Sequence, residues 1–134
     1  MTKSATNMSK FSTAFKKVLI VEDSYANLFI ASAMFKKWGF SVYTATNGVE
    51  AVDCITSDKF DLVLMDISMP IMSGIEATKI IRRFNNEMSL VPIVALTAHV
   101  SKEDHSLIYA SGMNDIITKP YTAIHLQEVI NRWV

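Results

Sequence analysis

Short apolar runs alternate with longer amphipathic segments five times along this chain, and this alternation constrains the fold more than any other feature. The runs have the length of buried strands, whereas the segments between them repeat their apolar residues at helical spacing. Such alternation is typical of a doubly wound α/β domain, in which helices cover both faces of a parallel sheet. The predicted strands are 17–21, 41–46, 62–65, 93–96 and 115–118, and the predicted helices are 25–38, 49–56, 75–84, 102–111 and 123–133.

The boundaries between these segments hold residues that commonly end or begin helices. Gly39 and Gly112 each follow a predicted helix, where glycine readily takes the left-handed conformation of a cap. Segment 41–46 alternates polar and apolar residues instead of being continuously apolar, so we expect it at an edge of the sheet. The predicted N-caps are Ser24, Asn47, Ser73, Ser101 and Thr122.

Composition narrows the classes of protein further. At 134 residues the chain is long enough for one domain with its own core. Thirteen basic residues balance thirteen acidic ones, so no global field favours nucleic acid or an anionic membrane surface, and no apolar run approaches the ~18 residues of a membrane span. The single cysteine, Cys54, excludes a disulfide framework and indicates a reducing compartment, which we take to be the cytoplasm. Residues 1–16 are expected to form a flexible arm.

Polar side chains follow four of the predicted strands at the point where each strand ends. Because parallel strands end at the same edge of a sheet, we expect these side chains to meet where ligands bind in open α/β sheets. Taken alone, an acidic pair after a strand is most often a solvated loop, but the coincidence of all four endings favours a site. The residues are Glu22 and Asp23 after the first strand, Asp66 after the third, Thr97 after the fourth and Lys119 after the fifth.

These side chains suit phosphoryl transfer with a divalent cation. Three carboxylates in a small volume repel one another, and a hard cation such as Mg²⁺ or Mn²⁺ relieves that repulsion. Asp66 can attack phosphorus and form an acyl phosphate. Lys119 can pair with this carboxylate and then with the phosphoryl group, and the hydroxyl of Thr97 can donate to a phosphoryl oxygen.

Two other functions use a similar layout. A metal-dependent phosphohydrolase with an Asp nucleophile would need a second acid two residues after Asp66, where this chain has Ser68. A flavodoxin-type cofactor binder would need a phosphate-binding loop after the first strand, where Glu22 and Asp23 would repel a phosphate. Both alternatives are therefore less favoured than a phosphoacceptor.

Four motifs occur in an order and spacing that identify a family. They are Val-Glu-Asp-Ser at 21–24, Met-Asp-Ile-Ser-Met-Pro-Ile-Met-Ser-Gly at 65–74, Ala-Leu-Thr-Ala at 95–98 and Gly-Met-Asn-Asp-Ile-Ile-Thr-Lys-Pro at 112–120. Together they closely resemble the receiver domain of two-component response regulators, over residues 16–134. In the residues around Thr97 and Asn114, the chain looks more like receivers of hybrid kinases and phosphorelays than like chemotaxis proteins.

The resemblance implies a fold and an activity. The fold would be flavodoxin-like, with a five-stranded parallel sheet in the order 2-1-3-4-5 and five helices, and the receiver domain would occupy residues 17–134. Asp66 would accept a phosphoryl group from a histidine kinase or a histidine phosphotransfer protein. The domain would then be a self-phosphorylating signalling domain that can also dephosphorylate itself, and not an enzyme with a separate substrate.

The resemblance also implies roles for the other site residues. Glu22, Asp23 and Asp66 would hold Mg²⁺, and the carbonyl of Ser68 would complete the protein ligands. Lys119 would form the ion pair of the family, across a cis bond to Pro120, and Thr97 would act as the switch residue. A pseudo-receiver used only for protein contacts would lack one or more of these residues, and none is missing here.

Two positions depart from the family pattern. Ile116 stands three positions before Lys119, where the family usually has an aromatic residue whose rotamer reports phosphorylation. Thr97 therefore has no aromatic ring at that position to which it could couple. The other departure is milder, because Glu22 stands where many members have Asp.

The first predicted helix has apolar residues on two faces. We expect Tyr25 and Phe29 to point outward at helical spacing, with Leu28 beside them, and to pack on a histidine phosphotransfer domain or kinase bundle. Ser32 and Lys36 would share this outward face. The predicted core-facing residues are Asn27, Ile30, Ala31, Met34 and Trp38.

Overall fold

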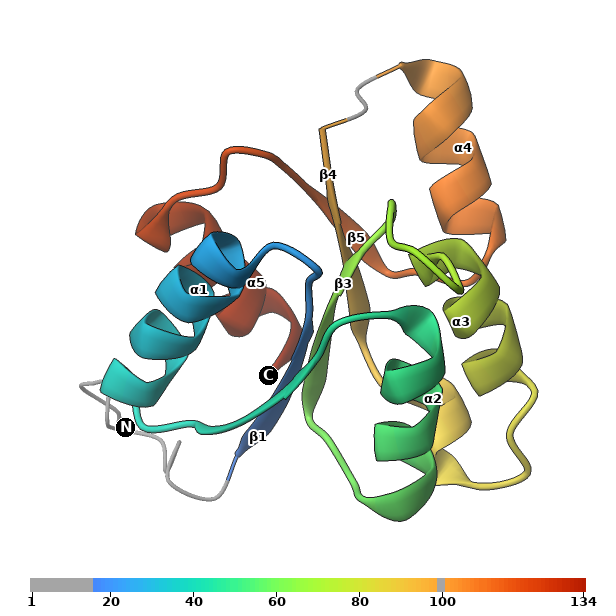
Figure 1. The fold of residues 1–134 in the computed structure, drawn as a ribbon, viewed down its shortest axis with the longest axis horizontal. Coiled ribbons are helices and arrows are strands. Elements are labelled where there is room, and N and C mark those ends of the chain that lie inside the picture. The colour runs from blue at the N-terminus through green and yellow to red at the C-terminus, as the bar shows by residue number, and fades with distance from the viewer. Residues whose placement is uncertain (1–15, 99–100) are drawn as a thin grey trace.

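The computed structural model describes residues 16–98 and 101–134. These residues form a five-stranded parallel sheet in the order β2-β1-β3-β4-β5, which confirms the predicted fold (Figure 1). The predicted arm, residues 1–16, lies outside the described residues except for Lys16, and its flexibility stays a prediction. The strands are β1 (Lys17–Val21), β2 (Ser41–Ala45), β3 (Leu62–Asp66), β4 (Ile93–Thr97) and β5 (Asp115–Thr118).

Helices cover both faces of the sheet, and each begins and ends within two residues of its predicted bounds. Two of them, α1 and α5, pack on one face, while α2, α3 and α4 lie on the other (Figure 1). A short 3₁₀ helix, η2 (Glu87–Leu90), has no counterpart among the predicted elements. Among the described residues, no helix combines the length and the apolar character that a membrane span requires. The helices are α1 (Tyr25–Lys37), α2 (Gly48–Ser57), α3 (Gly74–Arg82), α4 (Lys102–Ala110) and α5 (Ala123–Trp133).

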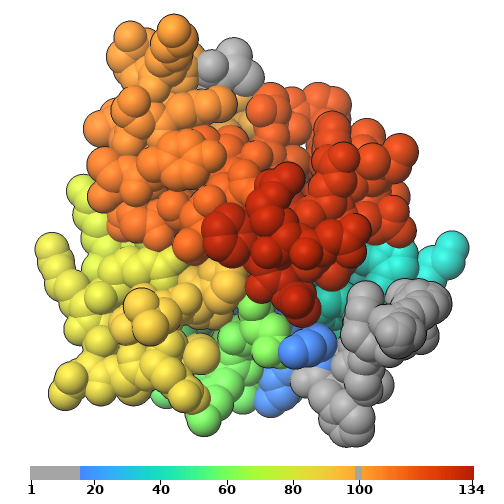
Figure 2. Space-filling view, turned by 180° about the vertical axis from the view of Figure 1, so that it is seen from behind, coloured from blue at the N-terminus to red at the C-terminus, as the bar shows by residue number. Residues whose placement is uncertain are grey.

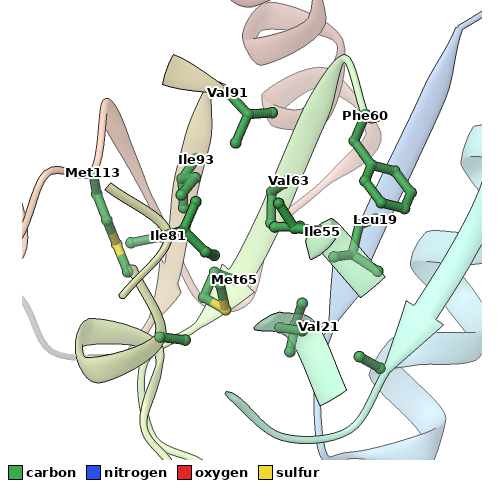
Figure 3. Packing of buried hydrophobic residues seen from close by; sticks show 14 of the residues in the cluster. Leu19, Val21, Ile55, Phe60, Val63, Met65, Ile81, Val91, Ile93 and Met113 are labelled. Atoms are coloured by element: carbon green, nitrogen blue, oxygen red, sulfur yellow. The ribbon is translucent and has the colours of Figure 1, made fainter. Parts of the chain in front are cut away.

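Two apolar clusters, one on each face, hold the layers together. Because side chains alternate along a strand, Leu19 and Val21 of β1 face one cluster, and Ile20 between them faces the other. Figure 3 shows the first cluster, in which the strand residues meet Ile55 of α2 and Ile81 of α3. Strands β1, β3 and β4 are almost fully buried, whereas β2 is largely exposed and lies at an edge, as its alternating sequence predicts.

The predicted helix boundaries are confirmed by their capping hydrogen bonds. At each predicted N-cap, the side chain accepts a hydrogen bond from the backbone N–H three residues later, which satisfies a donor that the helix itself leaves free. Gly39 and Gly112 have φ of +91° and +109°, the left-handed conformation expected of them. The capping residues are Ser24, Asn47, Ser73, Ser101 and Thr122.

The predicted inward face of α1 is wrong in part. Leu28 and Ser32, which were expected to point outward, are buried, whereas Ile30, expected in the core, is 49% exposed. The reason is that Phe35 is fully buried and packs edge-on against Phe40, the residue just before β2. That contact turns the stripe at 28, 31, 32 and 35 toward the sheet. Of the other predicted core residues, Ala31 is buried and Asn27, Met34 and Trp38 are partly buried.

The C-terminal helix is tied to the edge strand β5. Trp133 Nε1 donates to Asp115 Oδ2 at 3.0 Å, and Arg132 pairs with the same carboxylate. Burial opposes the charge on Asp115, but these bonds outweigh it and lower the pKa of the carboxyl. Seen from behind, residues 102–134 occupy the upper part and the centre of the visible surface (Figure 2).

Arg82, at the end of α3, fastens several segments at the edge of the sheet where the strands begin. Its guanidinium donates to the carbonyls of Ser89, Val91 and Gly112, at 2.7–2.9 Å. It also donates to Asn114 Oδ1 at 2.8 Å, and that oxygen accepts a second bond from the first residue of β4. One side chain thus joins α3, η2, β4 and the loop before β5.

Replacing Arg82 with Met should lower the free energy of unfolding by about 3 kcal/mol, because three backbone carbonyls lose a charged donor inside the protein. The matched control is Arg83→Met, which removes the neighbouring guanidinium from an exposed position. Urea unfolding of both variants checks the prediction. Equal transition midpoints for the two would show that the bonds of Arg82 contribute no stability.

Candidate functional site

Glu22 and Asp66 lie side by side because β1 and β3 are paired in register. Val21 stands opposite Met65, and the two acids come next on the neighbouring strands. Glu22 is 0% and Asp66 4% exposed, whereas Asp23 faces solvent. One carboxylate oxygen of each acid lies within 4.8 Å of the others. The three acids therefore converge at the edge where the strands end, as the sequence predicts.

Lys119 reaches the two buried acids from the end of β5. Its Nζ lies 3.0 Å from Asp66 Oδ2 and 3.0 Å from Glu22 Oε1. Its backbone N–H donates to the carbonyl of Thr97 at 2.8 Å, and the following bond to Pro120 is cis, as the family resemblance implies. Burial opposes the charge on Lys119, but the two carboxylates outweigh it and raise the pKa of the ammonium.

Glu22 carries the strongest electrostatic perturbation of the site. Its burial, together with the nearby Asp66 carboxylate, raises the pKa of Glu22 to about 7, even though Lys119 acts in the opposite direction. Two buried acids share one ammonium here and a third acid lies close by, so the charges of the side chains do not balance. A carboxyl that resists ionisation in the protein alone becomes a good ligand once a cation supplies positive charge.

All the predicted site residues line one open cavity of about 300 Å³. Thr97 is buried at the end of β4, and Ser68 is exposed on the loop after β3. The backbone N–H of Ser68 donates to Asp66 Oδ1 at 3.2 Å, while the metal-binding role of its carbonyl stays a prediction. The lining residues are Glu22, Asp23, Ser24, Asn27, Asp66, Ser68, Thr97, Ala98 and Lys119.

Asn27 was predicted to face the core and was not predicted as a site residue, but the structure places it in the wall of this cavity. Asn27 is only partly buried, and its carbonyl accepts a hydrogen bond from Tyr121 Oη at 3.3 Å. Burial and the charge of Glu22 raise the pKa of Tyr121 to about 12, so its hydroxyl remains a donor. An amide in an otherwise apolar helical stripe was the available signal, because such a residue is rarely placed in a core without a polar partner.

The backbone of Asp66 is held against the start of α3. A Cβ atom on Gly74 would lie 2.2 Å from the carbonyl oxygen of Asp66, so no side chain fits there. The N–H of Gly74 donates to the carbonyl of Ile67 at 3.1 Å, which closes the loop that follows β3. Asp66 therefore cannot move far from the edge of the sheet.

This chain is similar to only a small part of each of the curated proteins that it matches. A sensor protein, GacS of Pseudomonas syringae, is 40% identical over 87% of this chain, which amounts to 13% of its own length. The transcription factor SKN7 of Saccharomyces cerevisiae is 37% identical over 87% of this chain and 18% of its own length. The chain thus spans less than a fifth of the length of these relatives.

Solved structures with the same fold match almost end to end. The receiver domain of a sensor histidine kinase of Pseudomonas aeruginosa, with a magnesium ion coordinated in its active-site cleft, is 35% identical with a TM-score of 0.82, covering 88% of this chain and 96% of that one. The receiver domain of Ssk1 from Saccharomyces cerevisiae, crystallised with the histidine phosphotransfer protein Ypd1, is 38% identical with a TM-score of 0.81, covering 88% of each chain.

The sequence and the geometry of the strand ends lead to the same family. The model of the response regulator receiver domain matches residues 18–131, which include every residue of the cavity described above. This chain therefore belongs to the family of response regulator receiver domains.

Proposed function

We propose that Asp66 accepts a phosphoryl group from the phosphohistidine of a histidine kinase or histidine phosphotransfer protein, in a reaction that requires Mg²⁺. The observation that carries this proposal is the position of Asp66. Its carboxylate is buried at the end of a strand, 3.0 Å from the Lys119 ammonium and within 4.8 Å of two more acids. A receiver domain with similar sequence has magnesium in its cleft, and another binds a histidine phosphotransfer protein, which supports both parts of the proposal.

The acidic residues fit a hard divalent cation. Glu22, Asp23 and Asp66 offer oxygen ligands close enough to share one ion, and the carbonyl of Ser68 is the proposed fourth protein ligand. Mg²⁺ is the expected cation, and Mn²⁺ can replace it. When bound, the cation would neutralise charge on the phosphoryl oxygens that approach the acids. The exposed Asp23 leaves the site open to solvent.

In the proposed reaction, the side chains of the cavity position and neutralise the transferred group. An oxygen of Asp66 attacks phosphorus, the bond between phosphorus and the donor imidazole nitrogen breaks, and an acyl phosphate forms on Asp66. The Lys119 ammonium shifts from the carboxylate to a phosphoryl oxygen. The Thr97 hydroxyl donates to another oxygen of the group. Both contacts offset negative charge that the buried acids would otherwise repel.

Receiver domains are phosphoacceptor signalling domains. The phosphoryl group on Asp66 can be transferred either to a further acceptor or to water. We infer that this domain passes its phosphoryl group onward or changes conformation in response to it, and that it also hydrolyses the acyl phosphate itself. The second reaction is supported by the exposure of Asp23 and Ser68, which leaves water access to the cavity.

We further infer that the domain occupies residues 17–134. We also infer that it acts in the cytoplasm, because its single cysteine, Cys54, indicates a reducing compartment.

The proposed docking patch for the protein donor lies on α1. Tyr25 and Phe29 are 82% and 75% exposed, as expected, but the third member must change from the buried Leu28 to Ile30. Ile30 lines an open cavity of about 460 Å³ that also contacts Lys119 and Pro120, so the patch continues into the site. Large exposed apolar side chains beside a reactive carboxylate are better explained by a partner than by chance.

The first test of the acceptor is labelling with acetyl phosphate. The wild type should become phosphorylated in the presence of Mg²⁺, and Asp66→Asn should not, because the amide oxygen is too weak a nucleophile. Removing the cation with EDTA should reduce labelling of the wild type to background. Phosphate incorporation is read by intact-protein mass spectrometry. Equal labelling of the two proteins, or labelling in EDTA, contradicts the assignment.

The pKa of Glu22 predicts how stability depends on pH in EDTA. The pKa of Glu22 is raised to about 7 in the folded protein, so its protonated form stabilises the fold. This contribution is complete below the ordinary pKa of 4.5 and is lost as the pH rises through 7. The free energy of unfolding should therefore fall by up to about 3 kcal/mol between pH 5 and pH 8. Glu22→Gln should remove most of this fall. If urea unfolding gives the variant the same slope with pH as the wild type, Glu22 does not cause it.

The docking patch is tested by comparing two kinds of phosphodonor. Phe29→Ala should slow transfer from a phosphorylated histidine phosphotransfer protein severalfold, because the variant loses apolar area buried in the complex, about 25 cal/mol per Å². Labelling by acetyl phosphate should not change. Leu107→Ala is the control, since Leu107 is exposed on α4. Equal effects of Phe29→Ala on both donors, or no effect on either, would exclude the patch.

A further inference from the structure

The first turn of α1 differs in charge from the first turns of the next three helices. The third helical residue is Glu50 in α2, Glu76 in α3 and Asp104 in α4, whereas in α1 it is Asn27. An acid at this position is favourable, because the N-terminus of a helix carries partial positive charge and the carboxylate can complete a capping box. Asparagine gives up both advantages, and the first turn of α1 contains no acid at all.

The surroundings of Asn27 explain this exception. Asn27 lines the cavity that holds Asp66, where two buried acids and a third nearby already exceed the single ammonium. A further carboxylate would repel these acids and any phosphoryl group that enters the cavity. A carboxamide has almost the same shape, carries no charge and offers both donors and an acceptor. Asn27 therefore brings a neutral hydrogen-bonding group to a site that has an excess of negative charge.

The backbone of Asn27 is held on both sides, while its carboxamide is left unused. The N–H donates to the capping hydroxyl of Ser24 at 3.4 Å, and the carbonyl accepts a hydrogen bond from Tyr121 Oη at 3.3 Å. Within residues 16–98 and 101–134, no hydrogen bond involves the carboxamide, although Asn27 is partly buried. Because buried polar groups normally have a partner, this amide has capacity for a molecule that enters the cavity.

Asn27 also stands where two cavities meet. The site cavity and the cavity of about 460 Å³ beside Ile30 share Asn27, Ala98 and Lys119. Both cavities are open, so water can reach this shared wall. In the phosphorylated site, the cation, Lys119 and Thr97 are the proposed contacts of the phosphoryl oxygens, and an attacking water still needs a group that orients it. A carboxamide can do so, because its oxygen accepts a hydrogen bond from the water and directs a lone pair toward phosphorus.

We propose that the carboxamide of Asn27 holds the water that hydrolyses the acyl phosphate on Asp66, and that it thereby sets the lifetime of the phosphorylated domain. This inference rests on the proposed function, in which Asp66 carries the phosphoryl group and the domain hydrolyses it. The water oxygen attacks phosphorus, and the bond between phosphorus and the Asp66 oxygen breaks. Asp66 leaves as a carboxylate with the electron pair of that bond. One proton of the water moves to a phosphoryl oxygen, and inorganic phosphate is released.

Two variants separate the amide from the volume of its side chain. Asn27→Leu removes the amide but keeps the branching and the number of heavy atoms, whereas Asn27→Ala removes the amide and most of the side chain. The matched control is Asn131→Leu, because Asn131 is exposed near the end of α5 and does not line the cavity. Each protein is labelled with acetyl phosphate in saturating Mg²⁺, and the donor is removed by gel filtration. The phosphorylated fraction is then followed over time by intact-protein mass spectrometry.

We expect both Asn27 variants to lose the phosphoryl group about five to ten times more slowly than the wild type, the effect of one hydrogen bond made in the transition state. Labelling by acetyl phosphate should proceed at the wild-type rate, because water is not a reactant in that step. Normal labelling also shows that the variants are folded around Asp66. Asn131→Leu should match the wild type in both reactions.

Four results would overturn the proposal. Hydrolysis at the wild-type rate in either Asn27 variant would show that the water does not depend on the amide. Slower hydrolysis in Asn27→Leu with faster hydrolysis in Asn27→Ala would show that the side chain acts only by its volume. Equal slowing of labelling and hydrolysis would place the effect on the geometry of Asp66, and slower hydrolysis in Asn131→Leu would show that the effect is not specific to the site.

Failure of the proposed function would look different. It would be refuted if acetyl phosphate did not label even the wild type, or if the labelled wild type did not lose its phosphoryl group. Both outcomes are read from the wild type alone, before any variant of Asn27 is compared with it.

Discussion

A single ammonium between two buried carboxylates is the interaction on which the site depends. Lys119 lies 3.0 Å from both Glu22 and Asp66, and neither acid could be buried at low cost without it. Yet one positive charge does not balance three negative ones. Burial and the neighbouring Asp66 carboxylate raise the pKa of Glu22, and the excess of negative charge leaves the cavity suited to a cation. The same ammonium can then turn toward a phosphoryl group, so an incomplete ion pair suits the proposed chemistry better than a complete one.

The rest of the fold holds the strands and helices together below the site and leaves the site itself open to solvent. At the edge where the strands begin, Arg82 joins α3 to η2 and β4 through its hydrogen bonds. Between the two edges, two apolar clusters hold the helices against the sheet. At the edge where the strands end, exposed loops and the start of α1 surround the cavity. Contacts for a partner can therefore vary without disturbing the core.

Most of the architecture could be predicted from the sequence, because its signals are local. Apolar runs, capping side chains and glycines mark the elements to within two residues. The acids, Thr97 and Lys119 could be brought together because all parallel strands end at one edge. The features that escaped prediction depend on contacts between distant residues. The face of α1 is set by Phe35 against Phe40, and the four bonds of Arg82 join segments that no periodicity relates. The loop after β3 is likewise joined to a distant segment, because the N–H of Gly48 at the start of α2 donates to the carbonyl of Met72.

The parallel topology has an electrostatic consequence that involves no side chain. Each helix follows a strand and runs back across the sheet, so the first turns of the five helices lie toward the edge that holds Asp66 (Figure 1). The aligned peptide dipoles of a helix place about half a positive charge at its N-terminus. The backbone therefore contributes a positive potential that does not titrate and does not depend on the sequence of the loops. An incoming phosphoryl group is attracted by the backbone of the fold itself, although the side chains that receive it are mostly acidic.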